Sequence, residues 1–176
     1  MTTKDTKKKR PFPSKAELRE RIQALGLHGI DAAWDEIEGD EWLTRLVDLE
    51  ERERARRSLE RRIRSAKTGK FKPIEDFDWT WPKKIDRGAV EDLFQFEFVK
   101  DGMNVVLIGP NGVGKTTIAQ NLVHNALLAG HTARFVTASE MLNDLAAQDG
   151  RSALKRRIAR FVRPALLAID EVGYLS

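Results

Sequence analysis

The stretch Asn104-Val-Val-Leu-Ile-Gly-Pro-Asn-Gly-Val-Gly-Lys-Thr-Thr117 decides the fold. From Gly109 to Thr116 it fits the pattern G-x-x-x-x-G-K-[ST] without a mismatch. Its glycines let the backbone turn tightly and approach an anion without a Cβ atom in the way. The apolar residues 104–108 predict a buried strand before this loop, and residues 115–129 predict a helix after it. Strand, glycine-rich loop and helix in this order indicate a phosphate-binding loop (P-loop).

The P-loop predicts a site for ATP with Mg²⁺. Its amides can point inward as a nest for anionic oxygens, and the helix that follows adds its positive N-terminal end. We expect Lys115 to reach the β- and γ-phosphates, Thr116 to bind Mg²⁺ and Thr117 to contact the α-phosphate. The expected nucleotide-binding residues are therefore Gly109, Pro110, Asn111, Gly112, Val113, Gly114, Lys115, Thr116 and Thr117.

A second apolar run, residues 165–169, is followed by two acids, Asp170 and Glu171. A buried strand places Asp170 at the carboxyl edge of the sheet near the P-loop, where it can hold Mg²⁺ through water. Glu171 is the candidate general base for the attacking water. Thr116 and Asp170 are thus the candidate metal residues, and Lys115 and Glu171 the candidate catalytic ones.

The segments around these motifs alternate between helix and strand patterns. Residues 89–99 predict an amphipathic helix and residues 133–137 a strand. Ser139 is a candidate cap for a helix that runs to about residue 147, and residues 153–161 predict a basic helix. The order strand, loop, helix, strand, helix, strand predicts an α/β fold with a parallel sheet and helices on both faces.

The chain before residue 88 is helical and rich in arginine. Ser14 and Glu17 form a capping-box pattern, and Gly26 can end the helix that follows. A long helix is expected at about residues 41–66, with apolar positions at Trp42, Leu46, Leu49, Leu59 and Ile63. The expected domains are a disordered basic tail (1–13), a helical arginine-rich domain (14–68), a linker (69–87) and the first part of an ATPase domain (88–176).

The arginines of the long helix allow two interpretations. Pairs such as Glu50–Arg54 and Glu53–Arg57 would make it an exposed, ion-paired helix. Alternatively, its second half presents a DNA-binding face made of Arg56, Arg57, Arg61, Arg62 and Arg64. The linker aromatics Phe71, Phe77, Trp79 and Trp81 also have two interpretations, docking on a neighbouring core or stacking on bases, and we favour docking.

Composition excludes several classes of protein. The 176 residues contain no cysteine, which excludes disulfides and thiolate metal sites. No run of about 18 apolar residues predicts a membrane helix, and the N-terminus lacks a signal-peptide pattern. We therefore expect a bacterial cytoplasmic protein without a membrane partner. The net charge of +4 suits nucleic acid without requiring it.

Three segments carry a resemblance to a known family. They are Asp76-Phe-Asp-Trp79, Val105-Val-Leu-Ile-Gly-Pro-Asn-Gly-Val-Gly-Lys-Thr-Thr117 and Leu166-Leu-Ala-Ile-Asp-Glu-Val-Gly-Tyr-Leu175, which follow an arginine-rich helical region. Together they resemble the IstB family of transposition helper ATPases, which are AAA+ proteins of bacterial insertion sequences. The related DnaC-like helicase loaders share the P-loop and the strand that ends in Asp170, and they are the alternative.

The resemblance implies an activity and partners. Such proteins assemble as homo-oligomers on duplex DNA with ATP and stimulate a transposase. It also assigns Gly109, Gly114, Lys115 and Thr116 to the nucleotide and metal, Asp170 to the Mg²⁺ shell and Glu171 to hydrolysis. Base-specific readout is not implied, so DNA binding is expected to depend steeply on salt.

The family's sheet order, 5-1-4-3-2, implies that a strand beyond residue 176 lies between the two apolar runs. Without it, residues 104–108 and 165–169 are expected to lack their shared neighbour and to have bare edges. A neighbour-completing arginine finger is also expected beyond residue 176. We therefore expect that residues 1–176 alone are not a competent ATPase; an inactive remnant is the second alternative.

Overall fold

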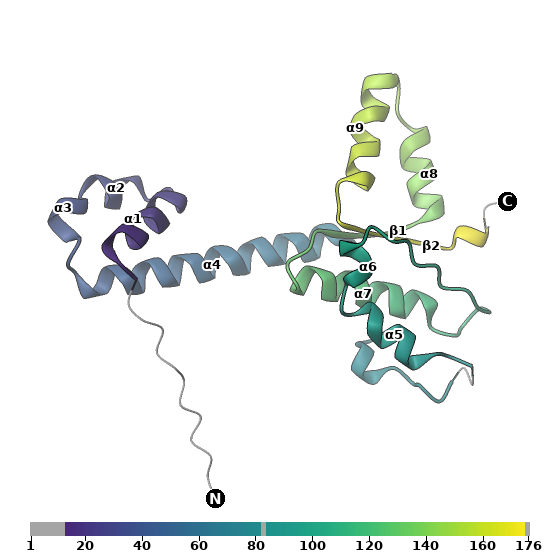
Figure 1. Ribbon diagram of the computed structural model, residues 1–176. Coiled ribbons are helices and arrows are strands. Elements are labelled where there is room, and N and C mark those ends of the chain that lie inside the picture. The colour runs from purple at the N-terminus through teal and green to yellow at the C-terminus, as the bar shows by residue number, and fades with distance from the viewer. Residues whose placement is uncertain (1–12, 82–83, 175–176) are drawn as a thin grey trace, which may run out of the picture. The chain divides into compact units, whose positions relative to one another are not determined.

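The computed structural model describes residues 13–81 and 84–174. It forms two compact units that divide between Arg57 and Ser58, inside the long helix α4 (Glu41–Ala66). The described part of the first unit is helical, and the second unit carries a parallel two-stranded sheet (Figure 1). The fold is therefore the mixed α/β type that the sequence predicts. The predicted disordered tail lies, except for Pro13, outside the described residues.

Three short helices and the start of α4 build the first unit: α1 (Lys15–Ala24), α2 (His28–Ala32) and α3 (Trp34–Ile37). The predicted capping box is present at α1. The Glu17 amide donates to Ser14 Oγ at 3.3 Å, and the Ser14 amide donates to Glu17 Oε2 at 2.7 Å. The predicted helix end is also confirmed, because Gly26 has φ +64° just after α1.

The buried face of α4 in this unit is not the stripe of apolar positions that the sequence analysis named. Trp42 and Leu49 are 48% and 50% exposed, and Leu46 is exposed as well. Leu43 and Val47 are instead fully buried, in a core shared with Leu18, Ile22 and Trp34. Residues four apart lie on one helical face, and two apolar stripes of this spacing run along the first half of α4. The sequence pattern does not decide which stripe meets α1 to α3.

Leu43→Ala is expected to destabilise the first unit by about 2–5 kcal/mol, because it leaves a cavity among buried side chains. Leu49→Ala, on the exposed stripe of the same helix, is the matched control and is expected to cost about 0.5 kcal/mol or less. Amide hydrogen exchange of α1 measures the difference. Equal loss of protection in the two variants would contradict this assignment of the core.

The sheet of the second unit consists of β1 (Ala133–Thr137) and β2 (Leu166–Asp170), which are parallel. The register pairs Ala133 with Leu166 and Thr137 with Asp170. Helix α7 (Lys115–Leu128) packs against both strands, and α8 (Ala138–Ala146) contacts β1. Figure 1 shows α7 on one side of the sheet and α8 with α9 (Arg151–Val162) on the other. This is the predicted layering.

The predicted strand at residues 104–108 is not part of this sheet. Among the described residues the sheet has the order β1-β2 only, and the segment before the P-loop has no ladder partner. Val106 is 76% exposed and Ile108 91% exposed, so the prediction of a buried strand was wrong for this chain. A strand forms by pairing its backbone with a neighbour, and apolar composition alone does not supply that neighbour.

Two helix boundaries also differ from prediction. The helix expected at 89–99 is two helices, α5 (Arg87–Leu93) and α6 (Glu97–Lys100), because Phe96 between them has φ +58°. Thr137, not Ser139, caps α8, and its hydroxyl accepts from the Glu140 amide at 3.1 Å. Thr137 ends β1 and begins the helix without an intervening loop.

The linker lies against α7, as predicted for three of its four aromatic residues. The Phe71 ring meets His124 of α7 at 5.4 Å, and the Phe77 and Trp79 rings lie 4.8 Å apart against the core of the second unit. Side-chain amides of α7 hold the linker backbone: Gln120 donates to the Thr68 carbonyl and Asn121 to the Lys72 carbonyl, both at 2.9 Å. Trp81 is 59% exposed and is the exception.

No helix within the described parts of the chain combines the length and the apolar character that crossing a membrane requires.

Candidate nucleotide-binding site

The P-loop enters helix α7 through two glycines with left-handed backbone conformations. Gly112 has φ +78°, and Gly114, the N-cap of α7, has φ +91°. Side chains rarely tolerate this region, so glycine is needed at both positions. The loop therefore ends directly at the N-terminus of a 14-residue helix, where free amides and the helix dipole favour an anion.

The Lys115 ammonium group lies inside the loop. Its Nζ donates to the Gly109 carbonyl at 2.8 Å and to the Pro110 carbonyl at 2.6 Å. The side chain thus folds back over the loop from the first turn of α7. An anion enclosed by the loop would lie within reach of this charge, and phosphate oxygens are stronger acceptors for an ammonium group than neutral carbonyls.

A hydrogen bond joins the two sequence motifs. Thr116 Oγ1 donates to Asp170 Oδ2 at 2.7 Å, although the residues are 54 positions apart in the chain. Thr116 is in the first turn of α7, and Asp170 is the last residue of β2. The hydroxyl and carboxylate oxygens form a compact pair of hard oxygen ligands, which fits the preference of Mg²⁺. The sequence-predicted metal pair is therefore brought together.

Glu171 follows β2 directly and is exposed. Its φ of +59° is unusual for a residue with a side chain and turns the chain sharply after Asp170. The side chain makes no hydrogen bond or ion pair with the residues that the structure describes. It stands at the same sheet edge as Asp170, which is where a base acting beside the P-loop is needed.

Sequence reasoning missed the part of Phe77 in this site. A Cβ atom added to Gly114 would lie 2.5 Å from Phe77 Cε2, so the Phe77 ring packs directly on the glycine that begins α7. The sequence predicts that Phe77 docks on a neighbouring core, without assigning the ring to the P-loop. Its aromatic character was the available signal, but nothing in the sequence told which part of the core it would touch.

Comparison with known proteins decides the family. Residues 14–176 match the family described as IstB-like ATP binding protein. The chain belongs to this IstB-like family. Its P-loop, its Thr116–Asp170 contact and its parallel strands are thus those of an IstB-like chain.

Three curated relatives agree with the IstB-like assignment. The chain is 33% identical over 159 residues to a protein of Geobacillus stearothermophilus named as an ATP-binding protein of insertion sequence IS5376. It is 34% identical over 144 residues to one of Pseudomonas aeruginosa named for insertion sequence IS21, and 39% identical over 129 residues to one of Mycobacterium tuberculosis. These matches cover 90%, 82% and 72% of this chain. They span 62%, 54% and 51% of the respective relatives.

The five arginines proposed for DNA binding in this IstB-like chain have different surroundings. In the first unit, Arg56 and Arg57 donate to Glu53 at 2.8 and 2.6 Å. The predicted Glu50–Arg54 pair is also present, at 2.7 Å. In the second unit, Arg62 donates to the Gly130 carbonyl at 3.0 Å. Arg61 and Arg64 are exposed and have no acid partner within the described parts of the chain. The DNA-binding assignment stays a prediction.

Gly114→Ala is expected to lower the affinity for a nucleotide analogue by about tenfold or more, because it combines backbone strain with the clash against Phe77. Removing the clash with Phe77→Ala in the same chain is expected to restore part of that loss. Gly112→Ala is the control: it adds φ strain, but its Cβ would meet nothing within 4 Å. If Phe77→Ala simply added a further loss to Gly114→Ala, the packing argument would be wrong.

Glu53 is expected to remain ionised far into acid. Hydrogen bonds from Arg56 and then Arg57 lower its pKa from 4.5 to about 2. A lowered carboxylate pKa stabilises the folded chain above pH 4.5, and this contribution is lost as the pH falls through about 2. An NMR titration of the Glu53 carboxyl carbon measures this pKa. Arg56→Gln with Arg57→Gln is expected to move the midpoint up towards 4.5, and an unshifted wild-type midpoint would contradict the pairing.

Proposed function

We propose that this chain is an ATP-binding AAA+ helper protein of DNA transposition, which assembles on duplex DNA with ATP and stimulates its transposase. The observation that carries the proposal is the hydrogen bond from Thr116 to Asp170, because it joins the end of the P-loop to the acid that follows an apolar strand. The family match and the names of the relatives, which are ATP-binding proteins of insertion sequences, support the same conclusion.

In this proposal each P-loop residue has a defined task. The amides of residues 109–117 and the N-terminus of α7 hold the phosphates, and Lys115 exchanges its loop carbonyls for phosphate oxygens. Thr116 and Asp170 would hold Mg²⁺, which when bound neutralises phosphate charge. Phe77 keeps the loop entry in place through its packing on Gly114.

Hydrolysis requires a base beside these groups, and Glu171 is the candidate. Its exposed position next to Asp170 leaves its carboxylate available to orient a water molecule. The chain spans 51–62% of the length of its first curated relatives, and an arginine finger is expected in the remaining part. We propose that Glu171 acts in ATP hydrolysis by orienting this water molecule.

The proposed DNA contact uses phosphates rather than bases. Arg61 and Arg64 carry exposed charge without acid partners among the described residues, and such guanidinium groups bind phosphate oxygens well. Binding by phosphate contacts releases counterions, so its affinity should fall steeply with salt and depend little on DNA sequence. Oligomerisation on DNA would follow from the family and is proposed on that basis alone.

Binding of a fluorescent ATP analogue to residues 1–176, with and without Mg²⁺, tests the nucleotide site. Lys115→Ala is expected to lower the affinity by about 10- to 100-fold, as for the loss of a hydrogen bond to a charged group. Lys100→Ala, which removes an exposed lysine paired with Glu97, is the matched control and should bind like wild type. Asp170→Asn should bind the analogue but lose the gain from Mg²⁺. Equal binding by wild type and Lys115→Ala would refute the proposed site.

A further inference from the structure

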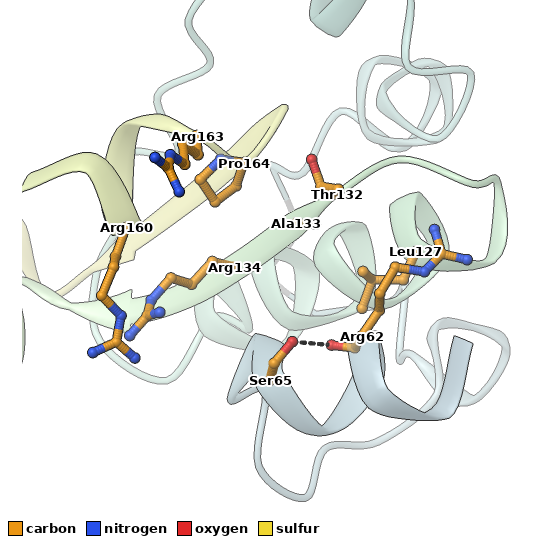
Figure 2. Close-up of a pocket in the computed structure, with 9 residues that line it drawn as sticks. All are labelled: Arg62, Ser65, Leu127, Thr132, Ala133, Arg134, Arg160, Arg163 and Pro164. Atoms are coloured by element: carbon orange, nitrogen blue, oxygen red, sulfur yellow. Dashed lines mark hydrogen bonds between the residues drawn. The ribbon is translucent and has the colours of Figure 1, made fainter. Parts of the chain in front are cut away.

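A second basic site lies at the opposite edge of the sheet from the P-loop. A pocket of about 370 Å³ opens where β1 and β2 begin, whereas Asp170 marks the edge where β2 ends. Four arginines line it, Arg62, Arg134, Arg160 and Arg163. Figure 2 shows the side chains of Arg134 and Arg160 extending to the same side, from β1 and from α9. No acidic side chain lines this pocket.

The pocket arginines lack the negative partners that clustered guanidinium groups require. Among the described residues, none of the four forms an ion pair. Two acids of α8, Asp144 and Glu140, act on Arg134 electrostatically without forming an ion pair with it. Asp144 is itself held by Arg157 at 3.3 Å, and Glu140 accepts from the Thr137 amide at 3.5 Å. Burial and then the neighbouring charge of Arg160 lower the pKa of Arg134. Like charges are thus held close together, an arrangement that an anion would relieve.

Two buried nitrogen donors at the pocket are also unsatisfied. Nε of Arg62 and Nε of Arg134 are buried without a hydrogen-bond acceptor. Buried donors are nearly always paired in folded proteins, so each one calls for an acceptor. Arg134 cannot easily swing away to find one, because its guanidinium group stacks over the Phe161 ring at 5.0 Å. The Arg134 guanidinium group is therefore a positive charge held in a fixed position at the pocket.

The ligand must be an anion whose bulk stays in solvent. Arg160 and Arg163 are exposed and Arg134 is half-buried, so the charged groups that line the pocket are within reach of an anion from solvent. Guanidinium groups match phosphate oxygens with paired hydrogen bonds. A DNA backbone offers such a phosphate on a polymer that remains outside the pocket. Arg62 lines the pocket but is not assigned to the ligand, because its guanidinium group donates to the Gly130 carbonyl.

We propose that this pocket binds a phosphodiester group of the DNA backbone through Arg134, Arg160 and Arg163. The inference rests on the DNA binding in the proposed function and gives that binding a defined site, separate from the nucleotide. It adds, to the contact proposed for Arg61 and Arg64, a second contact at an edge of the sheet that sequence reasoning did not single out.

Duplex binding by the full chain, measured by fluorescence anisotropy across salt concentrations, tests the pocket. Arg160→Gln with Arg163→Gln is expected to weaken duplex binding by about tenfold and to reduce the slope of log K against log salt by about 1, as for one lost phosphate contact. Arg151→Gln with Arg156→Gln is the matched control: it removes the same amount of charge, from α9, but leaves the pocket intact. Binding of the ATP analogue and the circular dichroism spectrum should be unchanged in both variants.

The remaining outcomes separate the two proposals. If the wild-type chain binds duplex and both double variants weaken this binding equally, the arginines act only through the overall positive charge of the chain. The pocket proposal alone then fails. If the wild-type chain binds the ATP analogue but no duplex, the DNA part of the proposed function fails and the pocket assignment fails with it. Inorganic pyrophosphate is titrated in parallel by NMR. A response of the Arg160 side chain to pyrophosphate, without one to duplex, would assign the pocket to a small phosphate compound and overturn the backbone assignment.

Discussion

The hydrogen bond between Thr116 and Asp170 is the contact on which the site depends, because it fixes the start of α7 against the end of β2. The elements around this hydrogen bond hold the two residues in contact. Helix α7 lies across both strands, so the P-loop opens at their carboxyl edge, and β1 fixes the register of β2 down to the Thr137–Asp170 pair. Two short oxygen-bearing side chains can meet across 54 residues of sequence only if the helix, the sheet and the linker all pack correctly.

Local signals in the sequence predicted much of this arrangement. Backbone freedom, helix caps and hydrophobic periodicity are local properties of the sequence. They predicted the glycine positions of the P-loop, the capping box at Ser14 and the bounds of α4 and β1. The contact of Thr116 with Asp170 is long-range, and the sequence predicted only that both residues lie near the Mg²⁺ site, from the P-loop motif and from the acid that follows an apolar strand.

The sequence left structural features wrong or undecided where they depend on contacts with residues far away in the chain. Residues 104–108 have the composition of a buried strand, but a strand needs a neighbour to pair with. Leu43 and Leu49 are equally apolar, and only the position of α1 decides which of them is buried. Phe77 could be recognised as a docking aromatic, yet its contact with Gly114 depends on how the linker crosses α7. In each case the competing choices have similar local free energies, and tertiary packing decides between them.

The contact between Phe77 and Gly114 gives the chain an internal optical signal. Trp79 lies 4.8 Å from Phe77 and under the guanidinium group of Arg87, which is 5.1 Å from its ring. The indole is therefore one ring removed from the glycine that begins α7. Any rearrangement of the P-loop that shifts Phe77 must change the surroundings of this indole and with them its emission. The linker thus makes events at the phosphate site visible in tryptophan fluorescence, without an attached dye.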